Sequence, residues 1–210
     1  MKNIFLKLKH WQLFLIMCLP PIALWFVMHI WFPSVAKNEN VNGPFNLEEI
    51  FLYFTIPLTF ISSIIRACYM LTILFALNNR MPTELKKNLV FPTISILFPM
   101  IYALVMCFLN YYAIQKLSNN DTNIIKVIIE ALPSYFLATT IIRPFHLFSI
   151  FSSFYSFYIE AKLLKTVEIQ QKAKINNYIR EFILFWIFII GIWFIQPRIN
   201  RIFEQENVTP

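Results

Sequence analysis

The sequence predicts an all-α, polytopic membrane protein, because its composition, its long apolar runs and the placement of its charges agree. Of the 210 residues, 58% are hydrophobic and 14% are charged, and the mean hydropathy is +0.60. These values are typical of membrane proteins rather than of soluble domains. No stretch between the apolar runs is long enough for an independent soluble domain. We therefore expect a single membrane domain over residues 1–210.

Four apolar runs are long enough to cross a bilayer, which takes a helix of roughly 20 residues. They cover residues 11–32, 50–77, 89–109 and 127–159. The first run lacks the small-residue cleavage site of a secretory signal, so we expect it to remain as a span. Pro20-Pro21 should kink it, because the second proline removes a backbone donor. The second and fourth runs exceed the required length and should tilt or project into the cytoplasm.

The fifth run, 182–195, is shorter than one bilayer crossing, and two arrangements fit it. If it spans, the tail lies outside together with Arg198 and Arg201, against the positive-inside tendency. If it lies in the membrane interface, the tail stays inside, and Trp186 and Trp193 help to anchor it. We favour spanning, which makes 182–210 a C-terminal span and tail added to four firmer spans.

Lysine and arginine gather in alternate segments between the runs. They precede the first run and occupy 78–88 and 160–181, whereas the intervening loops 33–49 and 110–126 hold few. Because cytoplasmic segments of membrane proteins are enriched in these residues, we predict a multi-pass protein of the cell inner membrane with a cytoplasmic N terminus. The net charge of +7 thus reports topology. Direct nucleic-acid binding is not expected, since 160–181 lacks the aromatic platforms on which bases stack.

A five-residue motif occurs twice, as Ser62-Ser63-Ile64-Ile65-Arg66 and as Thr139-Thr140-Ile141-Ile142-Arg143. Each copy lies in an apolar run, where a permanent cation is costly, so the motif marks the candidate functional site. Polar residues recur there at steps of three, namely Ser63, Arg66 and Tyr69 in the first copy and Thr140, Arg143 and His146 in the second. This spacing places each trio along one helix face. The two faces could meet and contact a partner or line a pore; otherwise each arginine reaches cytoplasmic headgroups or binds an anionic lipid.

The motif belongs to a longer internal repeat, with one unit over about 7–82 and the other over about 85–159. Each unit has a basic lead, a proline-broken outgoing helix, an outer loop and a return helix that carries the motif. Two spans per unit give both copies the same orientation. We therefore predict a parallel repeat about an axis near the membrane normal, followed by a cytoplasmic helical connector over 160–181.

No pattern in the sequence is typical of an enzyme. With only two glycines, Gly43 and Gly191, neither a phosphate-binding loop nor a nucleophile elbow can be drawn. The three histidines lack the spacing of metal ligands. We expect no catalytic residue, no metal and no cofactor, and the scarcity of glycine also disfavours a carrier with broken helices.

The lipid bilayer is the first expected partner, and two further interactions are suggested by the sequence. The segment 160–181 combines helix-forming residues with alternating charges, which suits docking to a cytoplasmic protein or, equally, a solvated connector. Serines at four-residue steps, Ser149 with Ser153 and Ser152 with Ser156, form a small-xxx-small pattern. That seam would join protomers of a homo-oligomer, and an oligomer around an axis would provide a membrane pore as the alternative function.

The ends of the chain are similar to those of small multispan proteins of flavobacterial type. The residues concerned are Leu8-Lys9-His10-Trp11-Gln12-Leu13-Phe14 and Gly191-Ile192-Trp193-Phe194-Ile195-Gln196-Pro197-Arg198-Ile199-Asn200. In size, span count and overall character the chain also resembles the membrane accessory proteins encoded beside the RNA-guided, RNA-cleaving effectors of type VI-B CRISPR systems. That resemblance implies a regulator of a cytoplasmic antiviral defence nuclease, docked through 160–181. The membrane subunit of the Kiwa antiphage system is a second match and implies a membrane sensor of another defence system.

Overall fold

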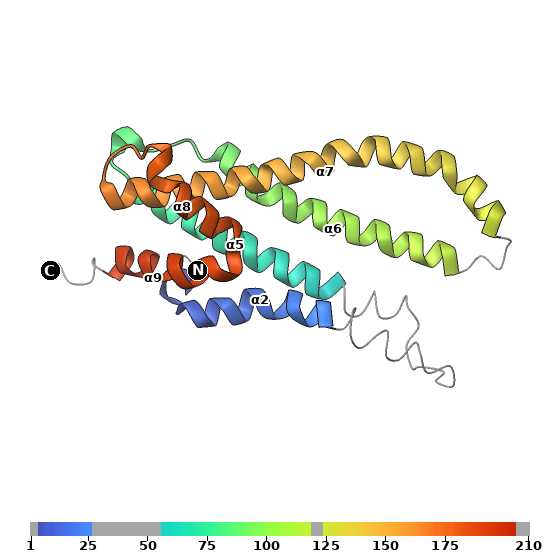
Figure 1. The fold of residues 1–210 in the computed structure, drawn as a ribbon, viewed down its shortest axis with the longest axis horizontal. Helices are drawn as coiled ribbons and strands as arrows, with labels where there is room; N and C mark the ends of the chain where they lie inside the picture. The colour runs from blue at the N-terminus through green and yellow to red at the C-terminus, as the bar shows by residue number, and fades with distance from the viewer. Residues whose placement is uncertain (1–3, 27–55, 119–123, 205–210) are drawn as a thin grey trace.

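A computed structural model describes residues 4–26, 56–118 and 124–204, and this part of the chain is helical without strands (Figure 1). Its elements are α1 (Ile4–Lys7), α2 (His10–Phe26), α5 (Ile56–Arg80), the 3₁₀ helix η3 (Thr83–Leu85), α6 (Val90–Ser118), α7 (Ile124–Ile169), α8 (Ile175–Trp186) and α9 (Phe188–Glu204). The predicted all-α class is confirmed. The predicted loop 33–49 and the adjoining ends of the first two runs lie outside the described residues.

Two helices, α5 and α6, are long and apolar enough to cross a membrane. Their most apolar windows have mean hydropathies of 1.9 and 2.1, and only 33% and 17% of those windows are buried. A core helix of a soluble protein with this composition would be mostly buried. The prediction of four or five spans is finer than these two helices support, because α2 is a shorter apolar helix and no further span was identified in the part of the chain that the structure describes.

Helices α2, α5, α6 and α7 form two antiparallel pairs. α2 and α6 run in one direction, α5 and α7 run in the other, and α2 packs on α5 as α6 packs on α7 (Figure 1). A parallel repeat requires these directions, although the equivalence of the two units stays a prediction. The helices continue through Pro20, Pro21 and Pro99. The predicted loop 110–126 is much shorter, since α6 extends to Ser118 and α7 begins at Ile124.

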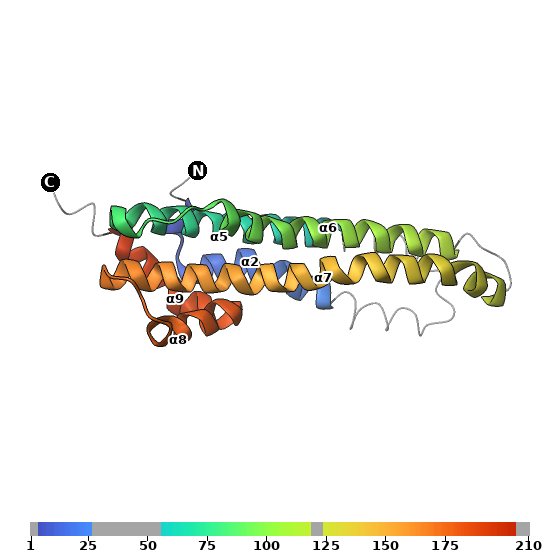
Figure 2. The ribbon, with the colours of Figure 1, turned by 90° about the horizontal axis from the view of Figure 1, so that it is seen from above.

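The predicted fifth span over 182–195 is not confirmed, because these residues do not form one continuous helix. Helix α8 ends at Trp186, and α9 begins at Phe188 and packs back against α8 as a hairpin (Figures 1 and 2). At 1.5 Å per residue α8 is only about 18 Å long, short of the roughly 30 Å hydrocarbon core. A Cβ atom on Gly191 would overlap the Leu184 carbonyl oxygen, so glycine is required where the two backbones meet.

Residues 160–181, predicted as a cytoplasmic helical connector, are divided between the end of α7, a turn and the start of α8. The first ten complete α7 and are largely buried, with Leu163 and Leu164 only 1% and 0% exposed. At Gln170 the backbone turns into the left-handed region, with φ of 51°, and its side-chain amide donates to the Val167 carbonyl oxygen at 2.7 Å. The exposed polar surface is therefore confined to the turn 170–174 and part of α8.

An ion-pair network fastens the hairpin to the end of α7. The guanidinium of Arg198 on α9 donates to both carboxylate oxygens of Glu168 on α7, at 2.7 and 2.6 Å, and to Glu181 on α8 at 2.8 Å. Partial burial alone would raise the pKa of Glu168, but the hydrogen bonds and charge of Arg198, aided by Lys165, outweigh it and lower that pKa. Charge pairing thus holds together three segments that are distant in sequence.

Candidate functional site

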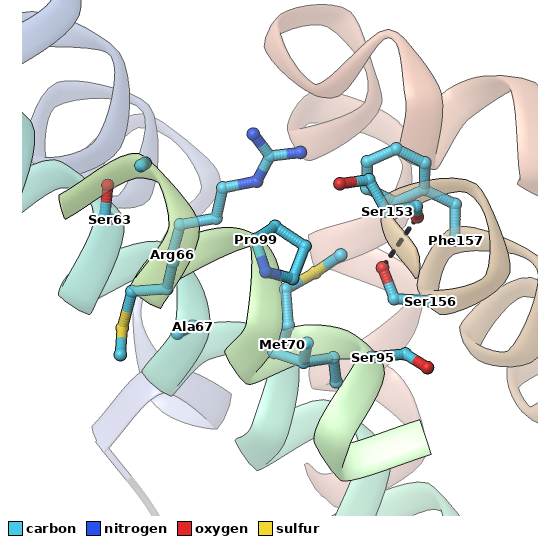
Figure 3. Close-up of a pocket in the computed structure, with 12 residues that line it drawn as sticks. Ser63, Arg66, Ala67, Met70, Ser95, Pro99, Ser153, Ser156 and Phe157 are labelled. Atoms are coloured by element: carbon cyan, nitrogen blue, oxygen red, sulfur yellow. Dashed lines mark hydrogen bonds between the residues drawn. The ribbon is translucent and has the colours of Figure 1, made fainter. Parts of the chain in front are cut away.

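The first copy of the arginine motif opens onto a cavity between α5, α6 and α7 (Figure 3). The cavity has a volume of about 170 Å³, and the Arg66 side chain remains accessible from it. Its polar lining consists of Arg66 and four serines, Ser63, Ser95, Ser153 and Ser156. Arg66 and Ser63 were both predicted as site residues, and the structure brings them to the same cavity.

The serines are small enough to let the helices approach, and three of their hydroxyls are tied to their own helices. Ser95 donates to the Phe91 carbonyl at 2.9 Å, and Ser156 donates to the Ser153 carbonyl at 2.7 Å. Ser153 donates to the Ser149 carbonyl at 3.0 Å. Because each proton is used by the backbone, each hydroxyl oxygen still offers lone pairs as an acceptor. Two of the four serines that the sequence assigned to protomer contacts, Ser153 and Ser156, thus line this cavity within one chain.

Aromatic rings flank the guanidinium of Arg66. Its central carbon lies 5.4 Å from the Phe157 ring centroid on α7 and 5.6 Å from the Phe188 centroid on α9. A cation over an aromatic face is attracted by the negative face of the ring, worth about 0.5–2 kcal/mol depending on desolvation. These contacts hold the arginine between three helices without removing its hydrogen-bond donors from the cavity.

The structure adds one acid that the sequence analysis left in the connector, Glu160. It is 0% exposed on α7, neither of its carboxylate oxygens accepts a hydrogen bond, and it interacts electrostatically with Arg66. Burying an acid without hydrogen bonds is costly, and an opposite charge nearby offsets part of that cost. The sequence feature that could have indicated Glu160 is its position directly after the apolar run, one helical turn after Phe157 on the same side of α7.

Tyr69, the third predicted residue of the first copy, has a structural role. Its buried hydroxyl donates to Oε1 of Gln196 on α9 at 3.0 Å. The amide of Gln196, itself 0% exposed, donates to the Phe5 and Leu8 carbonyls at 2.9 and 3.2 Å and to Asn200 Oδ1 at 2.8 Å. Tyr69 therefore links α5, α9 and the N-terminal segment. Sequence reasoning missed Gln196, whose signal was a lone amide within an apolar C-terminal stretch.

Among the side chains that the structure describes, the second copy is given no comparable cavity or aromatic contacts. Thr140, Arg143 and His146 are all exposed on α7, and Arg143 precedes Glu160 by roughly 25 Å along the helix axis at 1.5 Å per residue. His146 Nδ1 shares a hydrogen bond with the Tyr102 hydroxyl at 3.1 Å. The two motif faces, which the sequence allowed to meet, lie at different levels of the bundle within this chain.

The cavity offers a guanidinium and hydroxyl oxygens, and the buried Glu160 acts electrostatically on that guanidinium, a set suited to holding an anion. Among the described residues, no group of three His, Cys, Asp or Glu side chains could hold a metal ion. No protein-family model, curated protein or solved structure matches this chain significantly.

Proposed function

We propose that the chain is a non-enzymatic, multi-pass protein of the cell inner membrane that modulates a cytoplasmic effector docked on one end of its helical bundle. The observation that carries this proposal is that exposed apolar side chains lie along the bundle, whereas exposed basic side chains lie at one end of it. Along the bundle they are large and apolar, as with Trp25 at 56%, Phe108 at 60% and Phe151 at 69% exposure. A surrounding bilayer would remove this surface from water.

Basic residues, in contrast, gather at the end of the bundle where α7 ends and α8 begins (Figure 1). They come from the segment before α2, the end of α5, the α5–α6 connection, the end of α7, the turn between α7 and α8, and α9. They include Lys7, Lys9, Arg80, Lys86, Lys87, Lys162, Lys165, Lys172, Lys174, Arg198 and Arg201. By the positive-inside tendency this end faces the cytoplasm. The hairpin of α8 and α9 returns Arg198 and Arg201 to that end, which removes the violation that a fifth span would create.

Cysteine labelling tests this topology. In a chain whose three native cysteines are replaced, single cysteines are placed at Lys86, Ser118 and Glu204, and intact cells are treated with a membrane-impermeant maleimide. We expect labelling at Ser118→Cys alone. Labelling of Glu204→Cys but not of Lys86→Cys would mean a fifth span, and labelling of Lys86→Cys would overturn the cytoplasmic orientation.

The proposed docking surface is the exposed polar turn 170–174 with the start of α8. Beside it lies an open cavity of about 760 Å³ whose charged lining comprises Arg80, Arg198, Arg201 and Glu168. An excess of arginine suits an acidic surface on a partner. The resemblance to type VI-B accessory proteins suggests an RNA-guided, RNA-targeting nuclease as that partner, and the second resemblance suggests the effector of another antiphage system.

Affinity purification in mild detergent from the native host tests the partner. We expect the wild-type chain to retain an RNA-guided nuclease, and Lys174→Glu to lose it, because Lys174 is exposed on the docking surface. Lys86→Glu makes the same charge change on the neighbouring connection and should retain the nuclease. Recovery of the protein alone, as a defined oligomer, would contradict the modulator function.

A second candidate function, an oligomeric pore, is favoured by the Arg66 cavity. A guanidinium with serine hydroxyls amid apolar helices resembles the lining of an anion path. Anion flux into liposomes should then depend on Arg66→Ala and not on Arg143→Ala. Absence of flux from the wild-type protein would exclude this candidate.

A further inference from the structure

One lysine lies between two tyrosines at the basic end of the bundle, and two further lysines, Lys87 and Lys172, belong to the same electrostatic group. Lys162 on α7 is the central one, and its ammonium group donates to the Tyr158 hydroxyl at 3.1 Å. The same ammonium lies 5.4 Å from the Tyr158 ring centroid and 6.0 Å from that of Tyr178 on α8. The two tyrosine rings pack edge to face with centroids 5.7 Å apart. This lysine–tyrosine cluster is therefore held by contacts between helices.

Lys87, which precedes α6, is brought to the cluster by a clamp on its backbone. The buried side chain of Asn78 on α5 accepts from the Lys87 amide nitrogen at 3.0 Å and donates to the Lys87 carbonyl oxygen at 3.3 Å. Burial, together with the charges of Lys162 and Lys172, lowers the pKa of Lys87. Among the described residues, the groups that act on Lys87 are these two lysines and Tyr158, and none is a carboxylate. The fold thus places like charges together where a bound anion would relieve their repulsion.

Exposed apolar side chains border the cluster on two helices. On α6, Val90 and Phe91 are 64% and 53% exposed, and the Phe91 ring packs edge to face against Tyr155, 4.9 Å between centroids. On α8, Ile175 and Ile179 flank Tyr178 in sequence and are 63% and 53% exposed. The cluster therefore lies where an apolar surface gives way to the charged end, the boundary at which tyrosine and lysine anchor proteins in membranes.

We propose that Lys87, Lys162 and Lys172 bind the phosphate of an anionic phospholipid, whose acyl chains lie along the apolar surfaces of α6 and α8. The site rests on the proposed membrane location and adds a specific ligand to it. The three ammonium groups supply the charge, and the Tyr158 hydroxyl can donate to a phosphate oxygen. A phospholipid fits better than a free phosphate because only the lipid also covers the neighbouring apolar side chains.

Native mass spectrometry of the detergent-solubilised full chain tests the site, using phosphatidylglycerol and phosphatidylcholine with identical acyl chains as probes. We expect the wild type to bind phosphatidylglycerol roughly tenfold or more tightly than phosphatidylcholine. Two to three lysines near a phosphate together strengthen binding by at least about one order of magnitude. The variant Lys87→Gln/Lys162→Gln should lose this preference. The matched variant Lys86→Gln/Lys174→Gln removes two exposed lysines next in sequence to the cluster and should keep it.

Several outcomes would overturn the site. Equal loss of preference in both double variants would mean attraction by overall charge, and absence of preference in the wild type would mean that no such site exists. Displacement of the lipid by millimolar inorganic phosphate would indicate a free-anion site instead. If Lys87→Gln/Lys162→Gln fails to fold, the exposed Lys172→Gln provides the same comparison against Lys174→Gln. The lipid preference is measured in detergent, whereas the topology is measured by cysteine labelling in intact cells. A negative result in the first experiment can therefore be told apart from a negative result in the second.

Discussion

The two copies of the arginine motif have almost the same sequence but different surroundings. Arg66 lies between two aromatic rings, faces a serine-lined cavity and interacts with a buried acid. Arg143 is exposed at a different level of the bundle. The difference arises because α8 and α9 pack only beside the end of α7 that adjoins the first copy (Figures 1 and 2). A local motif therefore acquires a site only where other helices complete it.

The largest difference should appear when each arginine is removed. Arg66→Ala removes the contacts of the guanidinium with Phe157 and Phe188 and its electrostatic effect on Glu160, and because the Arg66 side chain is itself exposed we expect a loss of about 1–2 kcal/mol in unfolding free energy. Arg143→Ala alters an exposed position and should change it by no more than about 0.5 kcal/mol. Thermal unfolding of both variants in one detergent measures the contrast. Equal losses would show that the two copies have equivalent roles.

A double-mutant cycle should isolate the contribution of the acid. Combining Arg66→Ala with Glu160→Gln removes both interacting groups, so we expect the pair to be less destabilised than the sum of the single variants, by about 0.5–1 kcal/mol. Arg143→Ala with Glu160→Gln serves as the control and should be additive within about 0.5 kcal/mol. Additivity in both cycles would mean that Arg66 and Glu160 do not interact.

A matched pair of tyrosines extends the comparison to the hydrogen bonds. Tyr69→Phe leaves the buried Oε1 of Gln196 without its donor and should cost about 1–2 kcal/mol. Tyr102→Phe removes only the exposed bond to His146 and should cost less than about 0.5 kcal/mol. Chemical unfolding followed by tryptophan fluorescence provides the values. A greater cost for Tyr102→Phe would reverse the assigned roles.

The smallest effect concerns pH and the ion pairs that hold the hairpin beside the first copy. The folded-state pKa of Glu168 is below its ordinary value of 4.5. The ionised carboxylate therefore contributes to the free energy of unfolding above pH 4.5, and this contribution is lost as the pH falls through the lower, folded-state pKa. Both Glu168 and Arg198 are partly exposed, so we expect well under about 1 kcal/mol. Stability curves between pH 7 and 3 should flatten for Glu168→Gln. An unchanged curve would show that other acids govern the acid response.

The helical class and the approximate course of the four long helices could be predicted from the sequence. Long apolar runs favour helices because each backbone group is satisfied within its own segment, a local property. The fifth run was predicted as one span because hydropathy does not reveal where two backbones come close. In the structure Gly191 approaches Leu184, and the run is divided between α8 and α9. Gln196 and Glu160 were likewise missed, since their partners come from helices distant in the chain.

Sequence alone therefore determined what depends on neighbouring residues: helix type, the apolar character of the helices, the alternation of charged segments and the existence of a repeated motif. Tertiary structure alone decided which arginine meets an acid, which serines line a cavity and where the C-terminal helices return. The physical reason is that burial and electrostatic pairing depend on all groups within a few ångströms, and helix packing brings those groups together irrespective of their separation along the chain.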